Sequence, residues 1–242
     1  MFLITGCGKG IGRESLKYFC ESYTEPIVGI YRSEIDHQNH LDEFNSRLLL
    51  IKGDVSDENI YNKTFDKAIQ KFNYLPSKFI VNAGMRLRNN LEKVDSENLK
   101  NIWQINYFSL RNLLKTLILR NTISNDISLV YISSIVSSLG FKDLDDYGAT
   151  KAASESLIRS TSSRFSNSRF NSIAPGFTKT SYAENFRNNN ELLYDWTISR
   201  TPMNRWGNSE EIVYLIDFLL SPKASFITGQ TFKIDGGWSS NA

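Results

Sequence analysis

The stretch Phe2-Leu3-Ile4-Thr5-Gly6-Cys7-Gly8-Lys9-Gly10-Ile11-Gly12, at the start of the chain, decides the fold. Its first four residues form an apolar run typical of a buried strand, and a segment with helical character follows from about Arg13 to Tyr23. Glycines let the backbone turn tightly and approach a pyrophosphate, while the N-terminus of the next helix offers free N–H groups and a partial positive charge. The sequence therefore predicts a strand–turn–helix unit that binds a dinucleotide.

Short apolar runs recur along the chain, separated by longer segments with helical spacing. Most of the runs lack strict alternation of polar and apolar residues, as expected of strands that are covered on both faces. Such alternation of strands and helices indicates a parallel sheet with helices on both faces. The predicted fold is α/β, a Rossmann-type doubly wound parallel sheet of about seven strands. The predicted strands are Phe2–Thr5, Ile27–Ile30, Leu48–Ile51, Phe79–Val81, Ile127–Ile132, Phe170–Ile173 and Thr231–Ile234.

Two of the intervening segments carry clear helical signals. From Ser96 to about Arg120, apolar residues fall mostly three or four positions apart, so one stripe of this segment faces a core. Near the end of the chain, Asn208 and Glu211 have the spacing of a capping box before residues 212–220, and Pro222 follows.

Composition restricts the class of protein. The 242 residues include 28 Lys and Arg and 26 Asp and Glu, which gives a net charge of +2. This balance argues against a dedicated nucleic-acid binder, which usually has a strong basic excess. No composition break marks a linker, so a single domain over residues 1–242 is predicted.

Other features concern location. No apolar run approaches the roughly 18 residues of a membrane span, and the chain enters a strand at once, without the pattern of a signal peptide. Cys7 and Cys20 lack metal-ligand spacing and are expected to be reduced thiols. We therefore expect a cytoplasmic protein that does not bind membranes. His37 and His40 lie beside Asp36 in a polar loop, where solvated side chains are favoured, and no metal site is predicted.

The residues after the second predicted strand bear on which dinucleotide is bound. An acidic residue there binds the ribose 2′-hydroxyl of NAD, whereas an arginine accommodates the 2′-phosphate of NADP. The sequence reads Tyr31-Arg32-Ser33, and Lys9 in the glycine-rich turn is a second cation. This arrangement favours NADP(H), with ordinary solvated surface charges as the alternative.

Tyr147 and Lys151 form a Tyr-x-x-x-Lys pair in a segment with helical character. Residues i and i+4 share a helix face, so the two side chains are expected to lie together. A free tyrosine has a pKa near ~10, and a nearby ammonium stabilises the phenolate and lowers that pKa. The pair therefore suits general acid–base chemistry, although the motif taken alone is a weak signal.

Further motifs follow in order along the chain, from residue 2 to about residue 238. Thr5 and the glycines after it have the spacing Thr-Gly-x-x-x-Gly-x-Gly, and Ser134 lies 13 residues before Tyr147. The remaining motifs are Asp54-Val55 after the third predicted strand, Asn82-Ala83-Gly84 after the fourth, Asn106 in the long helical segment, Pro175-Gly176 with Thr180, and Asp235-Gly236-Gly237 after the last strand. In this order the motifs resemble the short-chain dehydrogenase/reductase family, in its compact single-domain branch with members such as 3-oxoacyl-carrier-protein reductases.

The resemblance implies an NADP(H)-dependent oxidoreductase that moves a hydride between the nicotinamide and a carbonyl or alcohol. It assigns Tyr147 as the general acid/base and Ser134 as a hydrogen-bond donor to the substrate oxygen. Lys151 is expected to lower the Tyr147 pKa and hold the ribose, and Asn106 to bend its helix around a water that serves Lys151. Ser133, next to Ser134, is expected to point the other way.

The resemblance also implies the residues that hold the cofactor. Two positions depart from the common pattern: Thr178 stands where an apolar residue is frequent, and Val81 where a second asparagine is frequent. The contact at Thr178 is expected to be made mostly by backbone, so binding is expected to be kept. The implied cofactor-binding residues are Gly6, Lys9, Gly10, Ile11, Gly12, Arg32, Asp54, Val55, Asn82, Ala83, Gly84, Tyr147, Lys151, Pro175, Gly176, Thr178 and Thr180.

The substrate is less well defined. Residues 181–205 occupy the place of the family's substrate lid, and their aromatic and cationic residues fit a sugar, an acyl chain, a phosphate or an ordinary helix core. Arg86 and Arg88 follow the Asn-Ala-Gly turn and suggest an anionic substrate.

Two other functional interpretations stay open: a catalytically silent NADP(H)-binding sensor or scaffold, and a nucleotide-sugar epimerase. The joint presence of Asn106, Ser134, Tyr147 and Lys151 argues against the first, and the short C-terminal part against the second. Family members commonly form dimers or tetramers, and apolar residues of the long helical segment, such as Phe108, predict a homo-oligomer.

Overall fold

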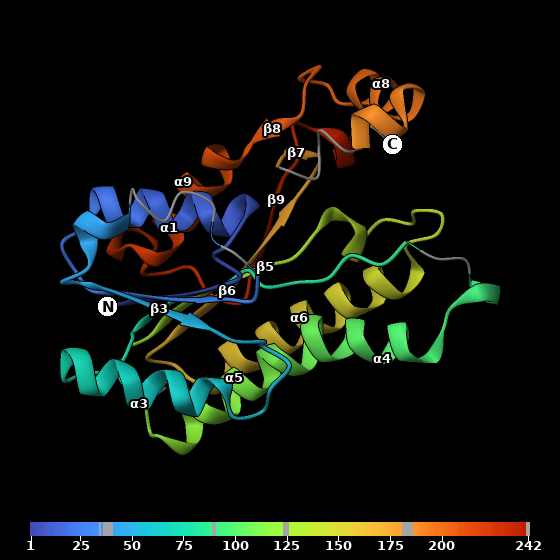
Figure 1. Ribbon diagram of the computed structural model, residues 1–242. Helices are drawn as coiled ribbons and strands as arrows, with labels where there is room; N and C mark the ends of the chain where they lie inside the picture. Colours follow the sequence, from blue (N-terminus) through green and yellow to red (C-terminus); the bar gives the residue numbers. More distant parts are fainter. Residues whose placement is uncertain (34, 36–40, 89–90, 123–125, 181–185, 241–242) are drawn as a thin grey trace.

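The computed structural model describes residues 1–33, 35, 41–88, 91–122, 126–180 and 186–240. Its centre is a seven-stranded sheet in which every pairing is parallel, with helices on both faces (Figure 1). The strand order is β3 (Leu48–Lys52), β2 (Ile27–Tyr31), β1 (Phe2–Thr5), β4 (Lys78–Val81), β5 (Ser128–Ile132), β6 (Arg169–Pro175) and β9 (Thr231–Ile234). The predicted doubly wound α/β fold is confirmed, and each predicted strand is found with bounds shifted by no more than two residues.

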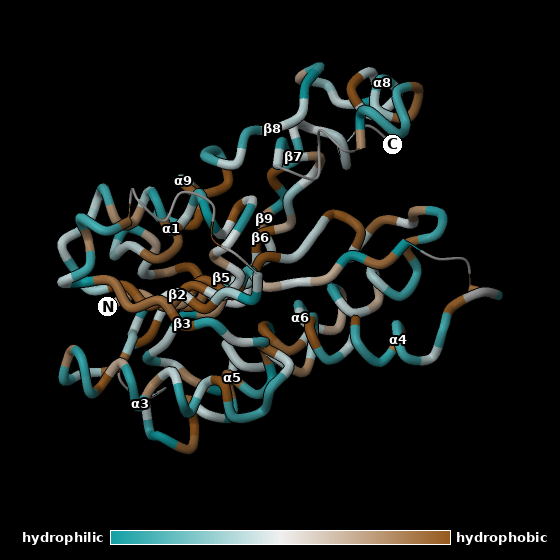
Figure 2. The backbone as a smooth tube through the Cα atoms, viewed as in Figure 1, coloured by the Kyte–Doolittle hydropathy of each residue, from teal (hydrophilic) through white to brown (hydrophobic). Residues whose placement is uncertain are grey.

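Two hydrophobic cores lie on opposite faces of the sheet because successive strand residues point in opposite directions. One core joins Leu3, Phe79 and Leu129 to helices α3 (Ile60–Phe72), α5 (Ser109–Leu119) and α6 (Asp145–Arg164). The other joins Phe2, Ile80 and Val130 to helices α1 (Gly10–Ser22) and α9 (Ser209–Leu220). Figure 2 shows the apolar strands between these two helix layers. The sheet is therefore buried on both faces, which explains the lack of alternation in its strands.

The long helical segment is interrupted at its centre. Helix α4 (Ser96–Trp103) passes into a π-helical turn, η3 (Gln104–Phe108), before α5 begins at Ser109. Such π-turns widen the helix by one residue and occur often at functional sites. Asn106 lies in the middle of this turn, so the helix departs from its regular form at the residue that the sequence singled out.

Helix ends are set by local hydrogen bonds. Helix α1 begins at Gly10, three residues before the predicted start, because the glycine-rich turn itself enters the helix. At α9 the backbone N–H of Asn208 donates to Glu211 Oε2 at 2.7 Å, as the capping-box spacing predicted. Pro222 opens the 3-10 turn η5 (Pro222–Ala224) after α9 ends.

A smaller unit lies beyond the ends of β6 and β9. It contains the two-stranded pairing of β7 (Thr178–Lys179) with β8 (Gly207–Asn208) and helix α8 (Glu191–Arg200). The remaining 3-10 turns are η1 (Asp42–Phe44), η2 (Leu91–Lys93), η4 (Ile135–Ser137) and η6 (Trp238–Ser240). None of the helices in the described part of the chain is long and apolar enough to cross a membrane.

Candidate active site

Two adjoining cavities open at the carboxyl ends of the strands, where the strand order changes direction between β1 and β4. This is the place where ligands bind in open parallel sheets. The first cavity, of about 600 Å³, is called the cofactor groove below, and the second, of about 310 Å³, the substrate cavity. Ile11, Asn82, Gly84, Met85, Arg86 and Thr180 line both, so the two form one continuous site.

The glycine-rich turn shapes one wall of the cofactor groove. Gly6 has φ +67° and Gly10 φ +57°, values that L residues with a side chain rarely adopt. A Cβ on Gly12 would lie 2.2 Å from the carbonyl oxygen of Gly6. Gly12 therefore packs behind the turn and does not line the groove, whereas Gly6, Gly10 and Lys9 do.

Asn82 fixes this turn against the end of β4. Its side-chain Nδ2 donates to the carbonyl of Gly6 at 3.0 Å and to that of Thr5 at 3.3 Å. In return, the backbone N–H groups of Asn82 and Ala83 both donate to Thr5 Oγ1 at 3.1 Å. The Asn-Ala-Gly motif therefore fixes the position of the glycine-rich turn beside the groove.

Arg32 and Asp54 close the far end of the groove, at the tips of β2 and β3. Arg32 Nη1 lies 3.4 Å from Asp54 Oδ2, and the arginine side chain is 70% exposed. Partial burial raises the pKa of Asp54, but hydrogen bonds from Ser56 and the charge of Arg32 outweigh it and hold that pKa below its usual value. The groove therefore ends in an exposed guanidinium that has room to turn toward an anion.

The groove fits the dinucleotide that the sequence predicts, because Gly6, Gly8 and Gly10 line it without side chains and the N-terminus of α1 faces it. Lining residues that the sequence did not single out for this role are Gly8, Ile30, Tyr31, Ser33, Gly53, Met85, Arg86 and Ile105. Of the predicted cofactor residues, eleven line the groove and five line the substrate cavity alone, namely Tyr147, Lys151, Pro175, Gly176 and Thr178.

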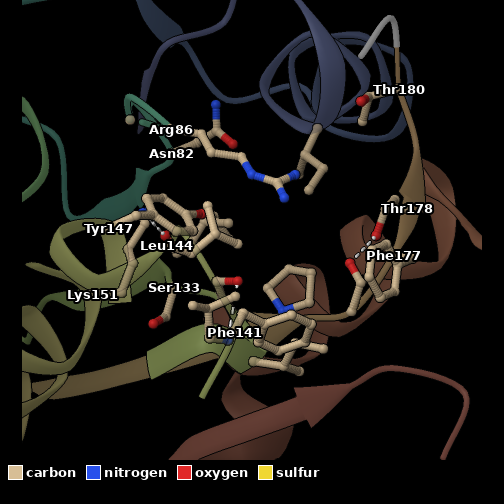
Figure 3. A pocket seen from close by; sticks show the side chains of 18 of the residues that line it. Asn82, Arg86, Ser133, Phe141, Leu144, Tyr147, Lys151, Phe177, Thr178 and Thr180 are labelled. Carbon is tan, nitrogen blue, oxygen red and sulfur yellow. Dashed lines mark hydrogen bonds between the residues drawn. The ribbon is translucent and has the colours of Figure 1, made fainter. Parts of the chain in front are cut away.

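Tyr147 and Lys151 lie on the first turns of α6 and face the substrate cavity (Figure 3). Lys151 Nζ lies 5.9 Å from the ring centroid of Tyr147 and 4.8 Å from that of Tyr131, and it donates to the carbonyl of Ile132 at 2.8 Å. Burial lowers the pKa of Lys151 to about 7, and the carboxylate of Glu155 acts in the opposite direction. The ammonium is therefore buried beside the phenol that it is expected to serve.

Ser134 enters the same cavity from the end of β5. Its hydroxyl oxygen accepts from the backbone N–H of Val136 at 3.3 Å, which caps the 3-10 turn η4 and leaves the hydroxyl hydrogen available for a ligand. Ser133, by contrast, donates its hydroxyl to Glu155 of α6. The two neighbouring serines both line the cavity but have different partners, and among the described residues the Ser134 hydroxyl has no acceptor for its hydrogen.

Asn106 lies behind Lys151 and joins three elements. Its Nδ2 donates to the carbonyl of Met85 at 2.9 Å and to Thr150 Oγ1 at 3.0 Å, and its Oδ1 accepts from the Met85 N–H at 2.8 Å. Its backbone carbonyl, turned out by the π-turn, accepts from Tyr131 and Ser154 hydroxyls at 3.3 and 3.0 Å. The residue therefore holds the Asn82-to-Arg86 loop against α6.

Part of the wall of the substrate cavity is apolar. It is formed by side chains from four separate segments, and sequence spacing gave no signal for them. They are Ile135, Val136, Phe141, Leu144, Phe177 and Trp206. Trp206 is buried, with its Nε1 donating to Thr197 at 2.7 Å, so α8 is attached to this wall.

Other predicted residues of this region have different outcomes. Arg86 lines both cavities, and in Figure 3 its side chain extends over the substrate cavity, whereas Arg88 lines neither. Residues 181–185 of the predicted lid and the pair His37 and His40 lie outside the described residues. In the described part of the chain, no group of three or more His, Cys, Asp or Glu side chains is arranged to hold a metal ion.

Comparison with known proteins agrees with this geometry. Residues 6–239 match the family model described as enoyl-(acyl carrier protein) reductase. A tropinone reductase homolog of Arabidopsis thaliana is 29% identical over 247 residues, covering 99% of this chain and 92% of the relative. A 3-oxoacyl-[acyl-carrier-protein] reductase of Thermotoga maritima is 27% identical, covering 97% of this chain and 96% of the relative.

Solved structures give the same result. ElxO with NADP bound superposes with a TM-score of 0.87 at 28% identity, covering 99% of this chain and 98% of that one. A 4-hydroxyisoleucine dehydrogenase mutant complexed with NADH and succinate has a TM-score of 0.88 at 26% identity, with the same coverage. Structural relatives therefore bind nicotinamide cofactors of both kinds. By the match over nearly its whole length, the chain belongs to the short-chain dehydrogenase/reductase family of oxidoreductases.

Proposed function

We propose that this protein is an NADP(H)-dependent oxidoreductase that transfers a hydride between the nicotinamide and a carbonyl or alcohol substrate, with Tyr147 as general acid/base. The observation that carries the proposal is the meeting of Ser134, Tyr147 and Lys151 in one cavity that opens onto the glycine-bounded groove. A catalytically silent sensor would not need these three groups around one space. The sheet, with strands drawn from residues 2–234, supports a single domain.

The chain's own residues supply position and proton transfer, while the bound cofactor supplies the hydride chemistry. In the reducing direction Ser134 donates a hydrogen bond to the carbonyl oxygen, and Tyr147 donates its proton to that oxygen as the bond order falls. The Lys151 ammonium stabilises the phenolate that is left. Asn106 holds the loop over Lys151 and keeps the π-turn carbonyl directed to that side of the site.

NADP(H) is proposed over NAD(H) because Arg32 and Lys9 are the cations at the groove end and its glycine turn. The experiment is a fluorescence titration of wild type and Arg32→Ala with NADPH and with NADH. We expect NADPH to bind wild type at least about tenfold more tightly than NADH, and Arg32→Ala to remove that difference, because a charge-assisted phosphate contact accounts for roughly that ratio. Equal or tighter binding of NADH to wild type would reverse the cofactor assignment.

The cavity wall bears on the substrate. Polyol hydroxyls placed against Phe141, Leu144 and Phe177 would lose hydrogen bonds to water without gaining partners. A carbonyl compound with an apolar body, such as an acyl chain or a ring, therefore suits the cavity better than a free sugar. We expect Phe141→Asn to raise the KM of such a ketone by about tenfold, and Lys142→Gln, at the exposed neighbouring position, to leave it unchanged. An unchanged KM in Phe141→Asn would contradict this substrate class.

Arg86 supports an anionic group elsewhere on the same substrate, since it reaches both cavities. Charge reversal in Arg86→Glu is expected to raise KM for an anionic substrate, whereas Arg88→Glu, which lies off both cavities, serves as the matched control. Equal effects of the two reversals would mean that only the general field of the protein matters.

We also propose a homo-oligomer. Phe108 and Ile118 are exposed apolar side chains of the η3–α5 segment, and Leu119 is 74% exposed. Light scattering at micromolar concentration should report a dimer or tetramer, and a monomer would refute the proposal.

A further inference from the structure

Two buried polar side chains beside the proposed catalytic groups take no part in the reaction described above. Ser133 follows β5 and is 4% exposed, and Glu155 lies on α6, one turn after Lys151, and is 7% exposed. Ser133 Oγ donates to Glu155 Oε1 at 2.5 Å. The other carboxylate oxygen lies 4.0 Å from Nη1 of the half-exposed Arg159. A carboxylate so deeply buried is unfavourable unless it is hydrogen-bonded and paired, so an apolar residue would be the simpler choice at this position.

The geometry shows what the pair holds together. The end of β5 is attached to α6 at two consecutive residues: Lys151 Nζ donates to the carbonyl of Ile132, and Ser133 donates to Glu155. Ser134 is the next residue along. The segment that carries the substrate-oxygen donor is therefore fastened to the helix that carries Tyr147, and the two side chains keep their relative positions in the cavity.

Glu155 also contributes charge. It lies at i+4 from Lys151, so the two share a face of α6. The titratable groups that face Lys151 are Tyr147 and Glu155 from α6 and Tyr131 from β5, while η3 and the loop after β4 present the uncharged Asn106 and Gly84. Among these described neighbours Glu155 is the carboxylate, and its effect on Lys151 is to favour the ammonium.

We propose that Glu155 is a positioning residue of this site: its carboxylate fastens the β5 end that carries Ser134 to α6, and its negative charge favours the ammonium form of the buried Lys151. The assignment rests on the proposed function for its catalytic meaning. The clamp, which is the hydrogen bond from Ser133 to Glu155, and the counter-charge, which is the Glu155 carboxylate, are both present in the protein without cofactor or substrate.

The charge is tested in the free protein by NMR titration of lysine labelled with ¹³C at Cε, with the Lys151 signal identified from Lys151→Met. Glu155→Gln keeps an acceptor for Ser133 and removes the charge. We expect Lys151 in Glu155→Gln to titrate lower than in wild type by at least about half a pH unit, because the attraction that favours its ammonium is lost. Glu210→Gln, the same change at an exposed position of α9, should leave the titration unchanged. An identical Lys151 titration in Glu155→Gln and wild type would overturn the proposed role of Glu155 as a counter-charge.

The clamp is tested with Ser133→Ala, which removes the hydrogen bond and leaves the charge. We expect kcat to fall about tenfold with the NADPH Kd unchanged, because a small displacement of one reacting group is costly in rate. Ser133→Thr, which keeps the hydroxyl, should restore most of that kcat, and equal kcat in Ser133→Ala and wild type overturns the clamp. If wild type itself turns over no carbonyl compound, the proposed function fails, while the NMR titration still decides the role of Glu155.

Discussion

The two cavities of the site are built in different ways. The cofactor groove is shaped mainly by backbone at the carboxyl ends of four strands: the glycine turn of residues 6–12 after β1, Asn82 after β4, and the tips of β2 and β3. The substrate cavity is walled by large side chains from distant segments, and Phe141, Phe177 and Trp206 meet there. One end depends on the absence of side chains, and the other on how side chains pack. NADPH binding in the cofactor groove should therefore be lost when a side chain is added there. The KM of the substrate should change gradually when side chains of the substrate cavity are replaced.

The largest effect on cofactor binding is expected where a side chain is added in the cofactor groove. In Gly12→Val the new Cβ would meet the Gly6 carbonyl oxygen at 2.2 Å and Asn82 Nδ2 at 2.4 Å, so the turn must be displaced. We expect NADPH affinity to fall by about 100-fold or more, because the backbone can no longer approach the phosphates closely. Gly140→Ala is the matched control at the substrate end, where no atom lies within 4 Å of the added Cβ. If Gly12→Val still binds NADPH as wild type does, the cofactor groove does not depend on the absence of side chains, and the contrast with the substrate cavity is lost.

In the substrate cavity, Tyr147→Phe removes one hydroxyl and keeps the ring. We expect kcat to fall by about 10²–10⁴-fold, the usual contribution of a positioned general acid or base, with the NADPH Kd unchanged. Tyr214→Phe on the exposed face of α9 is the control. A kcat of Tyr147→Phe within a few-fold of the wild-type value would mean that another group donates the proton.

Lys151 gives a prediction about stability, because its charge is buried beside the substrate cavity. Its pKa is about 7 in the folded protein and 10.5 in the unfolded chain, so between these values the unfolded state binds more protons and stability rises with pH. Lys151→Met should abolish turnover and remove about 3 kcal/mol of this rise between pH 6.5 and pH 9.5, because neither state of the variant binds a proton at this position. Urea unfolding of both proteins at the two pH values measures the free energies of unfolding, and an equal rise in wild type and variant would contradict the prediction.

The smallest effect is expected in the connection between α8 and α9. Glu211 accepts from Arg205 at 2.7 and 2.8 Å and from the N–H of Asn208, and these contacts, that of Arg205 first, hold its pKa at about 2. Its stabilisation is complete above the unfolded value of 4.5 and is lost as pH falls through 2. Because the pair is partly exposed, Glu211→Gln should cost only about 1 kcal/mol at pH 7. A change of several-fold in the substrate KM of Glu211→Gln would mean that the ion pair also positions α8 over the substrate.

Sequence patterns predicted the sheet, its order of elements and most of the cofactor groove, because each depends on local rules. The strands follow from apolar runs, the glycine turn from φ values that few residues adopt, and the Tyr147–Lys151 pair from helix periodicity. Patterns failed at Arg88, which lies off both cavities beside an Arg86 that lines them. Arg86 and Arg88 are two residues apart in a loop without periodicity, so the sequence suggests the same role for both. Only the path of the backbone decides which of them reaches the cavities.

The sequence by itself determined the nucleotide-binding unit, the class of fold and the residues that suit proton transfer, since spacing along a strand, turn or helix is enough for each. Only the tertiary structure decided where the helix widens around Asn106, and that Ser133, one of two adjacent serines that line the cavity, donates to Glu155 of α6. These depend on contacts between segments twenty or more residues apart. Such contacts form only when β5, α6 and the η3 turn pack together, and no local pattern specifies their side-chain directions.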